Sequence, residues 1–163
     1  MIRPDHLLEF VIKPVLRQLR MRSAAAEQLL LGIAAQESLL GQFLDQHPTG
    51  PAMGIYQMEG WVHDDQWSNW LTYRPAVAAR VWPLTMMLDS DYDGRWPMAE
   101  TMRGNLYYAT AMARIKLRRV PEPLPASNDV PGLAAYWKQH WNTELGAGTE
   151  AEFIDHFELT RTH

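Results

Sequence analysis

The sequence predicts a mainly α-helical protein, built as one domain of about six to eight helices. The chain has 163 residues, a length typical of one domain with a core of its own. Apolar side chains recur every three or four residues in most segments, a spacing typical of helices that bury one face. Only the turn-rich stretch at 42–60 leaves room for a short strand or hairpin.

The first part of the chain is expected to contain two long helical segments. Apolar residues between 5 and 20 have helical spacing, with a kink or break at Pro14, whose ring removes a backbone donor. Ser23 is a favourable N-cap for the next helix, and Gly41 suits the position just past its C-terminal end. We interpret residues 1–22 as an N-terminal helical extension of the single domain.

The middle of the chain is expected to form shorter, interrupted helices. Residues 61–73 and 75–89 have helical spacing, with Pro75 in the first turn of the second segment and Pro83 as a kink. A polar loop is expected to follow at 89–96.

Three further helices are expected toward the C-terminal end. The longest is predicted at about 97–119 and opens with Pro97, and another is predicted at about 130–142. Thr149 and Glu152 have the spacing of a capping box, which predicts a last helix that ends near residue 160.

Composition and charge exclude several classes of protein. The chain has no Cys, which excludes disulfide scaffolds, thiolate zinc sites and cysteine nucleophiles. Its formal net charge of −4 argues against a nucleic-acid partner. No apolar run reaches the roughly 18–20 residues that span a bilayer, so stable membrane insertion is not expected. The first residues lack the pattern of a secretory signal, so we expect synthesis in the cytoplasm.

Glu37 is the most informative residue of the predicted second helix. Positions 26, 30, 33, 37 and 40 share one face of this helix, and all of them except Glu37 are apolar. A carboxyl group on that face, in the last turn, loses solvation and meets the negative end of the helix dipole. Both effects raise its pKa, as a general acid requires near neutral pH. The alternative is that Glu37 lies at the edge of the stripe and is solvated.

Short motifs follow one another along the chain. The first is AQESLLG at 35–41, the second is AMGIYQM at 52–58, and NLYY at 105–108 precedes LAAY at 133–136. In these motifs the chain resembles the goose-type lysozyme and lytic transglycosylase superfamily, over roughly residues 24–141. The sequence departs from the family pattern where Tyr56 replaces the usual Met and Trp137 the usual Asn. Its composition is most similar to the small lytic domains carried by tailed-phage particles.

The resemblance implies a lysozyme-like fold and a peptidoglycan-cleaving enzyme. Glu37 would protonate the oxygen of the β-1,4 bond between N-acetylmuramic acid and N-acetylglucosamine. It would then act as a base on the muramoyl 6-hydroxyl as that oxygen closes onto C1, giving a 1,6-anhydro sugar with no water, metal or cofactor. The partners would be peptidoglycan glycan strands and, in a virion, other phage structural proteins. The enzyme would act in the periplasm or cell wall.

The resemblance also implies residues that bind the substrate around Glu37. Ser38 and Gln57 would contact the substrate or orient the carboxyl group, and Tyr136 would hydrogen-bond to that carboxyl group. Ser38 has a structural alternative, which is to bond back to its own helix.

Aromatic side chains are further candidates for the wall of a sugar groove. Tyr56, Tyr107 and Tyr108 would line it, but Tyr107 and Tyr108 point in different directions on one helix, so at most one of them reaches the groove. Five Trp residues fall between 61 and 96. Most of these are expected in the core, with Trp61 as the exception because it follows the Gly-x-x-Gln turn.

Two other functions are left open. A hydrolytic lysozyme of the same fold needs a second carboxylate about 5–9.5 Å from the first. The candidates are Asp45, which we would test first, and Glu59, Asp64 and Asp65. A non-catalytic virion or wall-binding module is the other alternative, because the replacements at Tyr56 and Trp137 weaken the match to the family.

No metal site is expected, and one basic cluster has two interpretations. The six His residues contain no His-Glu-x-x-His pattern, and neighbouring positions 63–65 diverge on a helix. The predicted helix at 97–119 ends with Arg114, Lys116, Arg118 and Arg119. Such a cluster is typical of a solvated face that complements the helix dipole, and an anionic wall polymer is the alternative partner.

Overall fold

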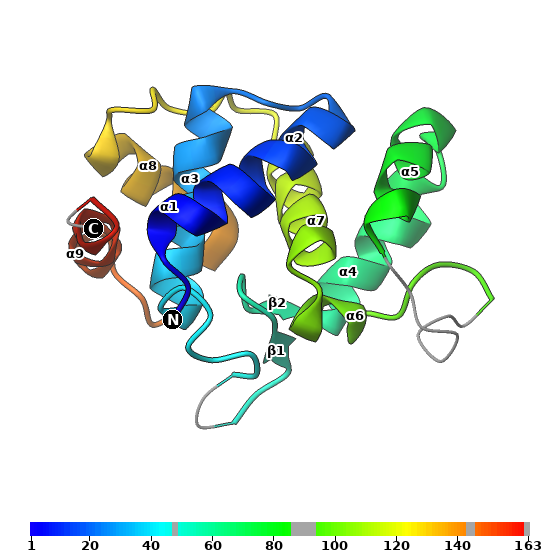
Figure 1. Ribbon diagram of the computed structural model, residues 1–163, viewed down its shortest axis with the longest axis horizontal. Helices are drawn as coiled ribbons and strands as arrows, with labels where there is room; N and C mark the ends of the chain where they lie inside the picture. Colours follow the sequence, from blue (N-terminus) through cyan, green and yellow to red (C-terminus); the bar gives the residue numbers. More distant parts are fainter. Residues whose placement is uncertain (47–48, 86–93, 143–145, 162–163) are drawn as a thin grey trace.

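The computed structural model describes residues 1–46, 49–85, 94–142 and 146–161, and it is mainly helical, as predicted (Figure 1). The α-helices are α1 (Pro4–Leu7), α2 (Lys13–Leu19), α3 (Ala24–Ser38), α4 (Gly60–Gln66), α5 (Pro75–Val81), α6 (Thr101–Gly104), α7 (Leu106–Arg118), α8 (Val130–Trp137) and α9 (Glu150–Leu159). The strands β1 (Ala52–Met53) and β2 (Met58–Glu59) form a small antiparallel sheet. Among the described helices, none combines the length and the apolar composition that a bilayer span requires.

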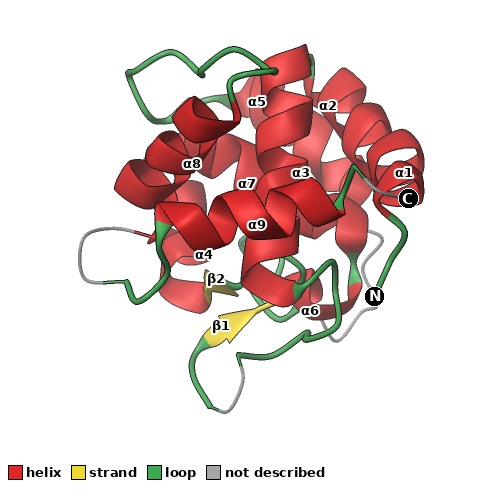
Figure 2. Cartoon of the chain, turned by 90° about the vertical axis from the view of Figure 1, so that its left-hand side faces the viewer, coloured by secondary structure: helices red, strands yellow, loops and turns green. Residues whose placement is uncertain are grey.

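Helix α3 runs through the middle of the molecule and packs against α7, α8 and α9 (Figures 1 and 2). Gly32 lets α9 approach closely, since a Cβ atom there would lie 2.5 Å from the ring of Phe153. The apolar residues of the predicted stripe are buried, but so is every residue from 29 to 35, so α3 is a central helix that is covered on all sides. This packing fixes the direction in which the C-terminal end of α3 presents its side chains.

The N-terminal segment is part of this core. A π-helical stretch (Leu8–Ile12) joins α1 to α2, and Lys13 N–H bonds to the Leu8 carbonyl across its wider turn. Pro14 therefore lies in a continuous helical run instead of breaking it, because the π turn lies directly before the residue that has no N–H. Apolar side chains of this segment, among them Leu16 and Leu19, are fully buried. The N-terminal helical extension thus packs into the core of the domain.

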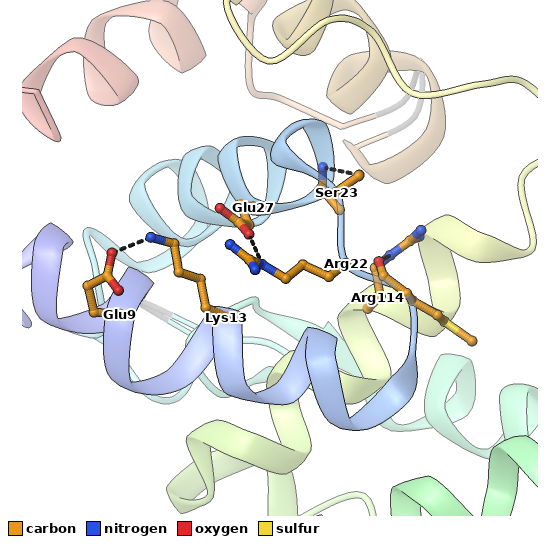
Figure 3. A network of polar contacts seen from close by, with 8 residues as sticks. Glu9, Lys13, Arg22, Ser23, Glu27 and Arg114 are labelled. Carbon is orange, nitrogen blue, oxygen red and sulfur yellow. Dashed lines mark hydrogen bonds and ion pairs between the residues drawn. The ribbon is translucent and has the colours of Figure 1, made fainter.

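A polar network holds the start of α3 (Figure 3). Ser23 is its N-cap, as predicted, and accepts a hydrogen bond from Ala26 N–H at 3.1 Å. The Arg22 side chain forms an ion pair with Glu27, and Arg114 of α7 donates to the Met21 carbonyl. These bonds link the loop before α3 to both α3 and α7.

The other end of α3 stops earlier than predicted. The helix ends at Ser38, because Leu39 and Leu40 both have left-handed backbone conformations, with φ of 49° and 56°. Their N–H groups bond to the carbonyls of Ala35 and Ala34 and so close the helix. The reversal leads the chain directly toward the β-hairpin.

The predicted short hairpin is confirmed at 52–59. Met53 pairs with Met58, and Gly54 begins the turn with φ of +73°. A Cβ atom at Gly54 would lie 2.3 Å from the Met102 carbonyl oxygen. Glycine is therefore needed here both for its backbone conformation and for the close approach to α6.

The middle segment contains the predicted interrupted helices. Helix α4 continues into a π-helical turn at Trp67–Leu71, and Pro75 opens α5 as expected. Pro83 lies in a 3-10 turn at Trp82–Leu84, which replaces the end of the predicted 75–89 helix. The rest of that helix, and most of the predicted 89–96 loop, lie outside the described residues.

The long helix predicted from Pro97 is wrong at its start. Helix α6 begins only at Thr101, and the backbone breaks at Asn105, which caps α7 by accepting from Tyr108 N–H at 3.0 Å. The Asn105 amide also donates to the carbonyls of Leu84 and Thr85. These side-chain hydrogen bonds of Asn105 stabilise a break in the helix at this residue more than a continuous helix would be stabilised.

The two last predicted helices are confirmed. Helix α8 continues through a π-helical turn at Lys138–Asn142, so the helical run ends where the sequence predicts. Helix α9 begins with the predicted capping box of Thr149 and Glu152, in which both reciprocal hydrogen bonds are present.

Candidate functional site

A cleft of about 1150 Å³ opens beside the C-terminal end of α3. Its walls come from α3, the hairpin, α4, α7 and the π-helical turn after α8. Segments that are far apart in the sequence therefore meet around one hollow. Its lining includes Glu37, Glu59 and Lys116, so the cleft holds charges of both signs.

Glu37 lies in this cleft with its carboxyl group largely shielded from solvent. Burial raises the pKa of Glu37 to about 7, while a hydrogen bond from Trp137 and the positive charge of Lys116 oppose that rise. The indole Nε1–H of Trp137 donates to Oε1 of Glu37 at 2.8 Å. A neutral donor thus orients the carboxyl group without forcing it to stay ionised, which leaves Glu37 able to give and take a proton near neutral pH.

Trp137 is held firmly in the position from which it donates. Its side chain is 1% exposed and stacks on Phe153 with the ring centroids 5.3 Å apart. Gly148 lies against the indole, where a Cβ atom would come within 2.7 Å of it. The residue that departs from the family pattern is therefore the direct partner of Glu37.

Lys116 brings a positive charge to the same part of the cleft. Its ammonium group lies 3.9 Å from the centre of the Trp141 ring and donates to the Trp141 carbonyl. Burial lowers the pKa of Lys116 to about 8, although the charges of Glu37 and Glu59 both raise it. The ammonium group therefore interacts with two carboxylates of one cleft.

Ser38 and Gln57 have different positions relative to the cleft. Ser38 is 1% exposed, and its single hydroxyl hydrogen is shared between the carbonyls of Ile55 at 2.7 Å and Ala34 at 3.2 Å, so it bonds back to its own helix and also ties that helix to the hairpin turn. It does not line the cleft, and its hydrogen bonds go to Ala34, Ile55 and Gly41 and not to Glu37. Gln57 lines the cleft, and its side-chain amide donates to the Gly54 carbonyl at 2.8 Å.

Two of the tyrosines assigned to the groove belong to the core. Tyr56 is 1% exposed and its hydroxyl group is 3.1 Å from Thr110 Oγ1, so it joins the hairpin to α7. Tyr108 is fully buried, accepts from Trp67 Nε1–H and lies 2.6 Å from His63 Nε2. The expectation that Tyr56 and Tyr108 line the groove is wrong, because both rings face the interior between helices.

The other two tyrosines also miss the cleft. Tyr107 is exposed, but it is not among the residues that line the cleft. Tyr136 is 6% exposed and donates its hydroxyl hydrogen to the Glu122 carbonyl at 3.2 Å. The hydrogen bond to Glu37 that was predicted from Tyr136 is instead made by the next residue, Trp137.

The candidate second carboxylates separate into two groups. Glu59 and Asp65 line the cleft that contains Glu37, and Asp65 is paired with Arg119 at 2.6 Å. Asp45 does not line it and forms an ion pair with Arg103. Asp64 also lies outside the lining and is hydrogen-bonded to His63. Glu59 therefore replaces Asp45 as the carboxylate to test first.

The tryptophan prediction is confirmed. Trp61 is 68% exposed and lines the cleft, and its indole N–H donates to Glu59. Trp67 is 3% exposed, while Trp70, Trp82 and Trp96 are partly buried against the core. An exposed indole face at a cleft is suited to stacking on the apolar face of a sugar.

Sequence reasoning missed the partners of the carboxyl group. Lys116 belongs to the basic cluster for which the sequence predicts a solvated face or a contact with an anionic polymer, yet Met112 and Ala113, one turn earlier on α7, are fully buried. That spacing was the available sign that Lys116 faces inward. Within the described residues, no group of three or more His, Asp or Glu side chains is arranged to hold a metal ion.

The chain matches no protein-family model, and comparisons with curated proteins and with solved structures also find no match. The resemblance to goose-type lysozymes and lytic transglycosylases therefore remains a prediction, and it is based on the short sequence motifs alone.

Proposed function

We propose that this protein is a peptidoglycan-cleaving enzyme of the lytic transglycosylase type, with Glu37 as its general acid and base. The observation that carries the proposal is the Glu37 carboxyl group, which lies in the large cleft with a pKa raised to about 7. A carboxyl group in that state is protonated often enough to give its proton to a leaving oxygen at neutral pH.

The surroundings of Glu37 suit both halves of such a reaction. In the first half, Glu37 gives its proton to the glycosidic oxygen as the bond to C1 breaks. In the second half, the carboxylate takes the proton of the muramoyl 6-hydroxyl as that oxygen bonds to C1. The Trp137 N–H and the Lys116 charge stabilise the carboxylate that exists between the two transfers. The product is a 1,6-anhydro sugar, and no water is consumed.

The cleft also suits a glycan strand. It is open to solvent and contains the exposed Trp61 ring as a stacking surface, together with the Gln57 side chain as a polar contact. Peptidoglycan strands are thus the proposed partner. A role in wall penetration or lysis by a phage, alone or within a virion, is proposed from the sequence resemblance.

Hydrolysis by a lysozyme-type reaction is the second candidate, and the position of Glu59 favours it. Glu59 lines the same cleft, and Lys116 interacts electrostatically with both Glu59 and Glu37. A second carboxylate there would activate water or stabilise the developing positive charge at C1. The two reactions differ by one water in the product.

Mass spectrometry of the released muropeptides, after purified protein is incubated with peptidoglycan, distinguishes the two reactions. Anhydro ends support the transglycosylase, whereas reducing ends heavier by one water support the hydrolase. Glu37→Gln is expected to lower the rate by about 10²–10⁴-fold. Glu59→Gln separates the two reactions, since it should affect hydrolysis strongly and transglycosylation only weakly.

The matched control is Glu27→Gln, which changes a second glutamate of α3 that lies outside the cleft. Equal cleavage by the wild type and Glu37→Gln would contradict the proposal. Glycan binding without any released fragment between pH 4 and 8 would instead indicate a non-catalytic wall-binding module.

A further inference from the structure

A second hollow adjoins the cleft and is lined by arginines. It has a volume of about 600 Å³ and shares Arg119, Val120 and Pro121 with the cleft as a common wall. It is lined by residues of α2, α5 and the C-terminal end of α7, and α2 packs against the other two helices. We call it the arginine hollow, and its arginines are Arg20, Arg74, Arg80, Arg118 and Arg119.

The charge of this hollow is unusual for this chain. The protein has a formal net charge of −4, yet five of its 15 Lys and Arg residues line this one hollow. Within the described part of the chain, no acidic residue lines it. Guanidinium groups gathered with few counter-charges repel one another, so an anion that neutralises them is stabilised there.

Most of these guanidinium groups have no ionic partner. Arg119 is paired with Asp65. No ion pair within the described residues involves the other four arginines of the hollow. Arg74 lies over the Trp70 ring at 4.3 Å, which fixes its position at the wall. Planar guanidinium groups with free N–H donors are the preferred partners of carboxylates.

Helix capping accounts for only part of this cluster, since Arg80 donates to the Leu19 carbonyl and Arg74 to the Trp70 carbonyl, while the other three arginines have no such role among the described residues. At the C-terminal end of α2, the N–H groups of Arg20 and Met21 already bond to the last carbonyls, and Arg80 bonds to the Leu19 carbonyl. At the end of α7, the N–H groups of residues 119 and 120 likewise bond to carbonyls of the last turn of the helix. The side chains of Arg20 and Arg118 are exposed and are not needed for either helix end.

Arg20 also stands where another residue would be more stable. Its φ is 57°, a left-handed conformation at the C-terminal end of α2, where glycine is favoured. An arginine at that position is unfavourable for the backbone but places a fifth cation at the hollow.

We propose that the arginine hollow binds the carboxylate groups of the peptide stem that branches from the glycan in the adjoining cleft. This inference rests on the proposed function, because it takes the occupant of the cleft to be peptidoglycan. The stem begins at the muramoyl lactyl group and carries free carboxylates, while Leu19, Met21 and Val77 offer apolar contacts beside the arginines. The hollow would select peptide-bearing strands over bare glycan.

The test measures binding in the Glu37→Gln background, so that no probe is cleaved. The probes are N-acetylmuramoyl-L-alanyl-D-glutamate and the same molecule with both carboxyl groups amidated, and affinities are measured by titration calorimetry. We expect the carboxylate form to bind at least about tenfold tighter at low salt, with the preference falling as salt rises. Equal affinities would overturn the proposal.

Matched variants locate the site. Arg74→Gln with Arg118→Gln should abolish the preference, whereas Arg3→Gln with Arg161→Gln, which also removes two exposed positive charges, should keep it. The same preference in both double variants would overturn the assignment. A single-stranded oligonucleotide that outcompetes the carboxylate probe would overturn it as well, in favour of a nucleic-acid site.

A third variant tests Arg20 separately. Arg20→Gly should raise the melting temperature, because glycine suits the left-handed backbone, and should lower the affinity for the carboxylate probe. An unchanged affinity would exclude Arg20 from the site.

Failure of the proposed function is distinguishable from failure of this inference. If the wild type cleaves no peptidoglycan but the carboxylate preference depends on Arg74 and Arg118, the inference stands without the enzymatic function. If cleavage occurs and the preference is absent, the enzymatic function stands and the inference fails.

Discussion

Two glutamates of one helix, ten positions apart, have opposite environments. Glu27, near the start of α3, is 7% exposed and its carboxylate accepts from Arg22 Nε at 2.6 Å (Figure 3). Glu37, near the end of α3, accepts from the neutral indole of Trp137, and burial raises its pKa to about 7. The first carboxylate is neutralised by a directly bonded cation, whereas the second has only a more distant positive charge.

Under the proposed function, this difference separates a structural carboxylate, Glu27, from a reactive one, Glu37. The ion pair between Glu27 and Arg22 joins the loop before α3 to the helix. A neutral donor orients Glu37 but leaves the charged form costly, so that a proton binds near neutral pH. Burial is the main cause of the raised pKa of Glu37, and its neutral partner offsets only part of that effect.

Replacing Glu37 gives the largest expected change in stability, and its sign depends on pH. The pKa of this group is raised from 4.5 in the unfolded chain to about 7 in the folded protein. Its contribution to stability is therefore complete below pH 4.5 and lost as the pH rises through 7. Glu37→Gln should leave stability unchanged at pH 4 and raise it at pH 8 by up to about 3 kcal/mol.

Denaturant unfolding of the wild type and Glu37→Gln at both pH values measures this difference. The same variant is expected to lose cleavage activity, so stability and activity should change in opposite directions. A constant difference in unfolding free energy across this pH range would show that the Glu37 pKa is not raised.

Replacing Glu27 should have the opposite effect on stability. Glu27→Gln removes the ionic partner of Arg22 at a mostly buried position and should lower the free energy of unfolding by about 1–2 kcal/mol at pH 7. Arg161→Gln, which removes an exposed ion pair with Glu158, is the control and should change stability by less than about 0.5 kcal/mol. Equal effects of the two variants would place Glu27 with the surface ion pairs.

Replacing Trp137 should change the pH dependence of cleavage. Trp137→Phe keeps an aromatic ring against Phe153 but removes the N–H that favours the charged form of Glu37. The alkaline limb of the rate profile, near pH 7 in the wild type, should move upward by up to about one pH unit, with a lower maximal rate.

Trp82→Phe serves as the control because Trp82 does not line the cleft. A profile of Trp137→Phe that moves to lower pH would contradict the assigned hydrogen bond.

Replacing Lys116 should have the smallest effect, in the same direction. Lys116→Met removes a positive charge that lowers the pKa of Glu37 without bonding to it directly. The alkaline limb of cleavage should move upward by a few tenths of a pH unit. Lys13→Met, which removes a cation paired with Glu9 outside the cleft, should leave the profile unchanged. If Lys116→Met moved the alkaline limb further than Trp137→Phe does, the charge of Lys116 would affect the Glu37 pKa more than the Trp137 hydrogen bond, contrary to this prediction.

Helix ends and turns could be predicted from the sequence where residues close together in the chain determine them. The cap at Ser23, the capping box at Thr149 and the turn at Gly54 all depend on short-range bonds or backbone conformation, and each was predicted correctly. Asn105 was missed although Asn is a favoured N-cap, because helical spacing on both sides suggested continuity through it.

The sequence alone determined that the protein is mainly helical and that Glu37 lies on an apolar stripe near a helix end, because helical periodicity assigns each residue to a face. Tertiary structure decided which side chains meet that carboxyl group. Trp137 bonds to it from the core and Lys116 approaches it from the wall of the cleft, while Tyr56 and Tyr108 turn into the core. Periodicity gives the face of one helix, but the direction of that face depends on how the helices pack against one another.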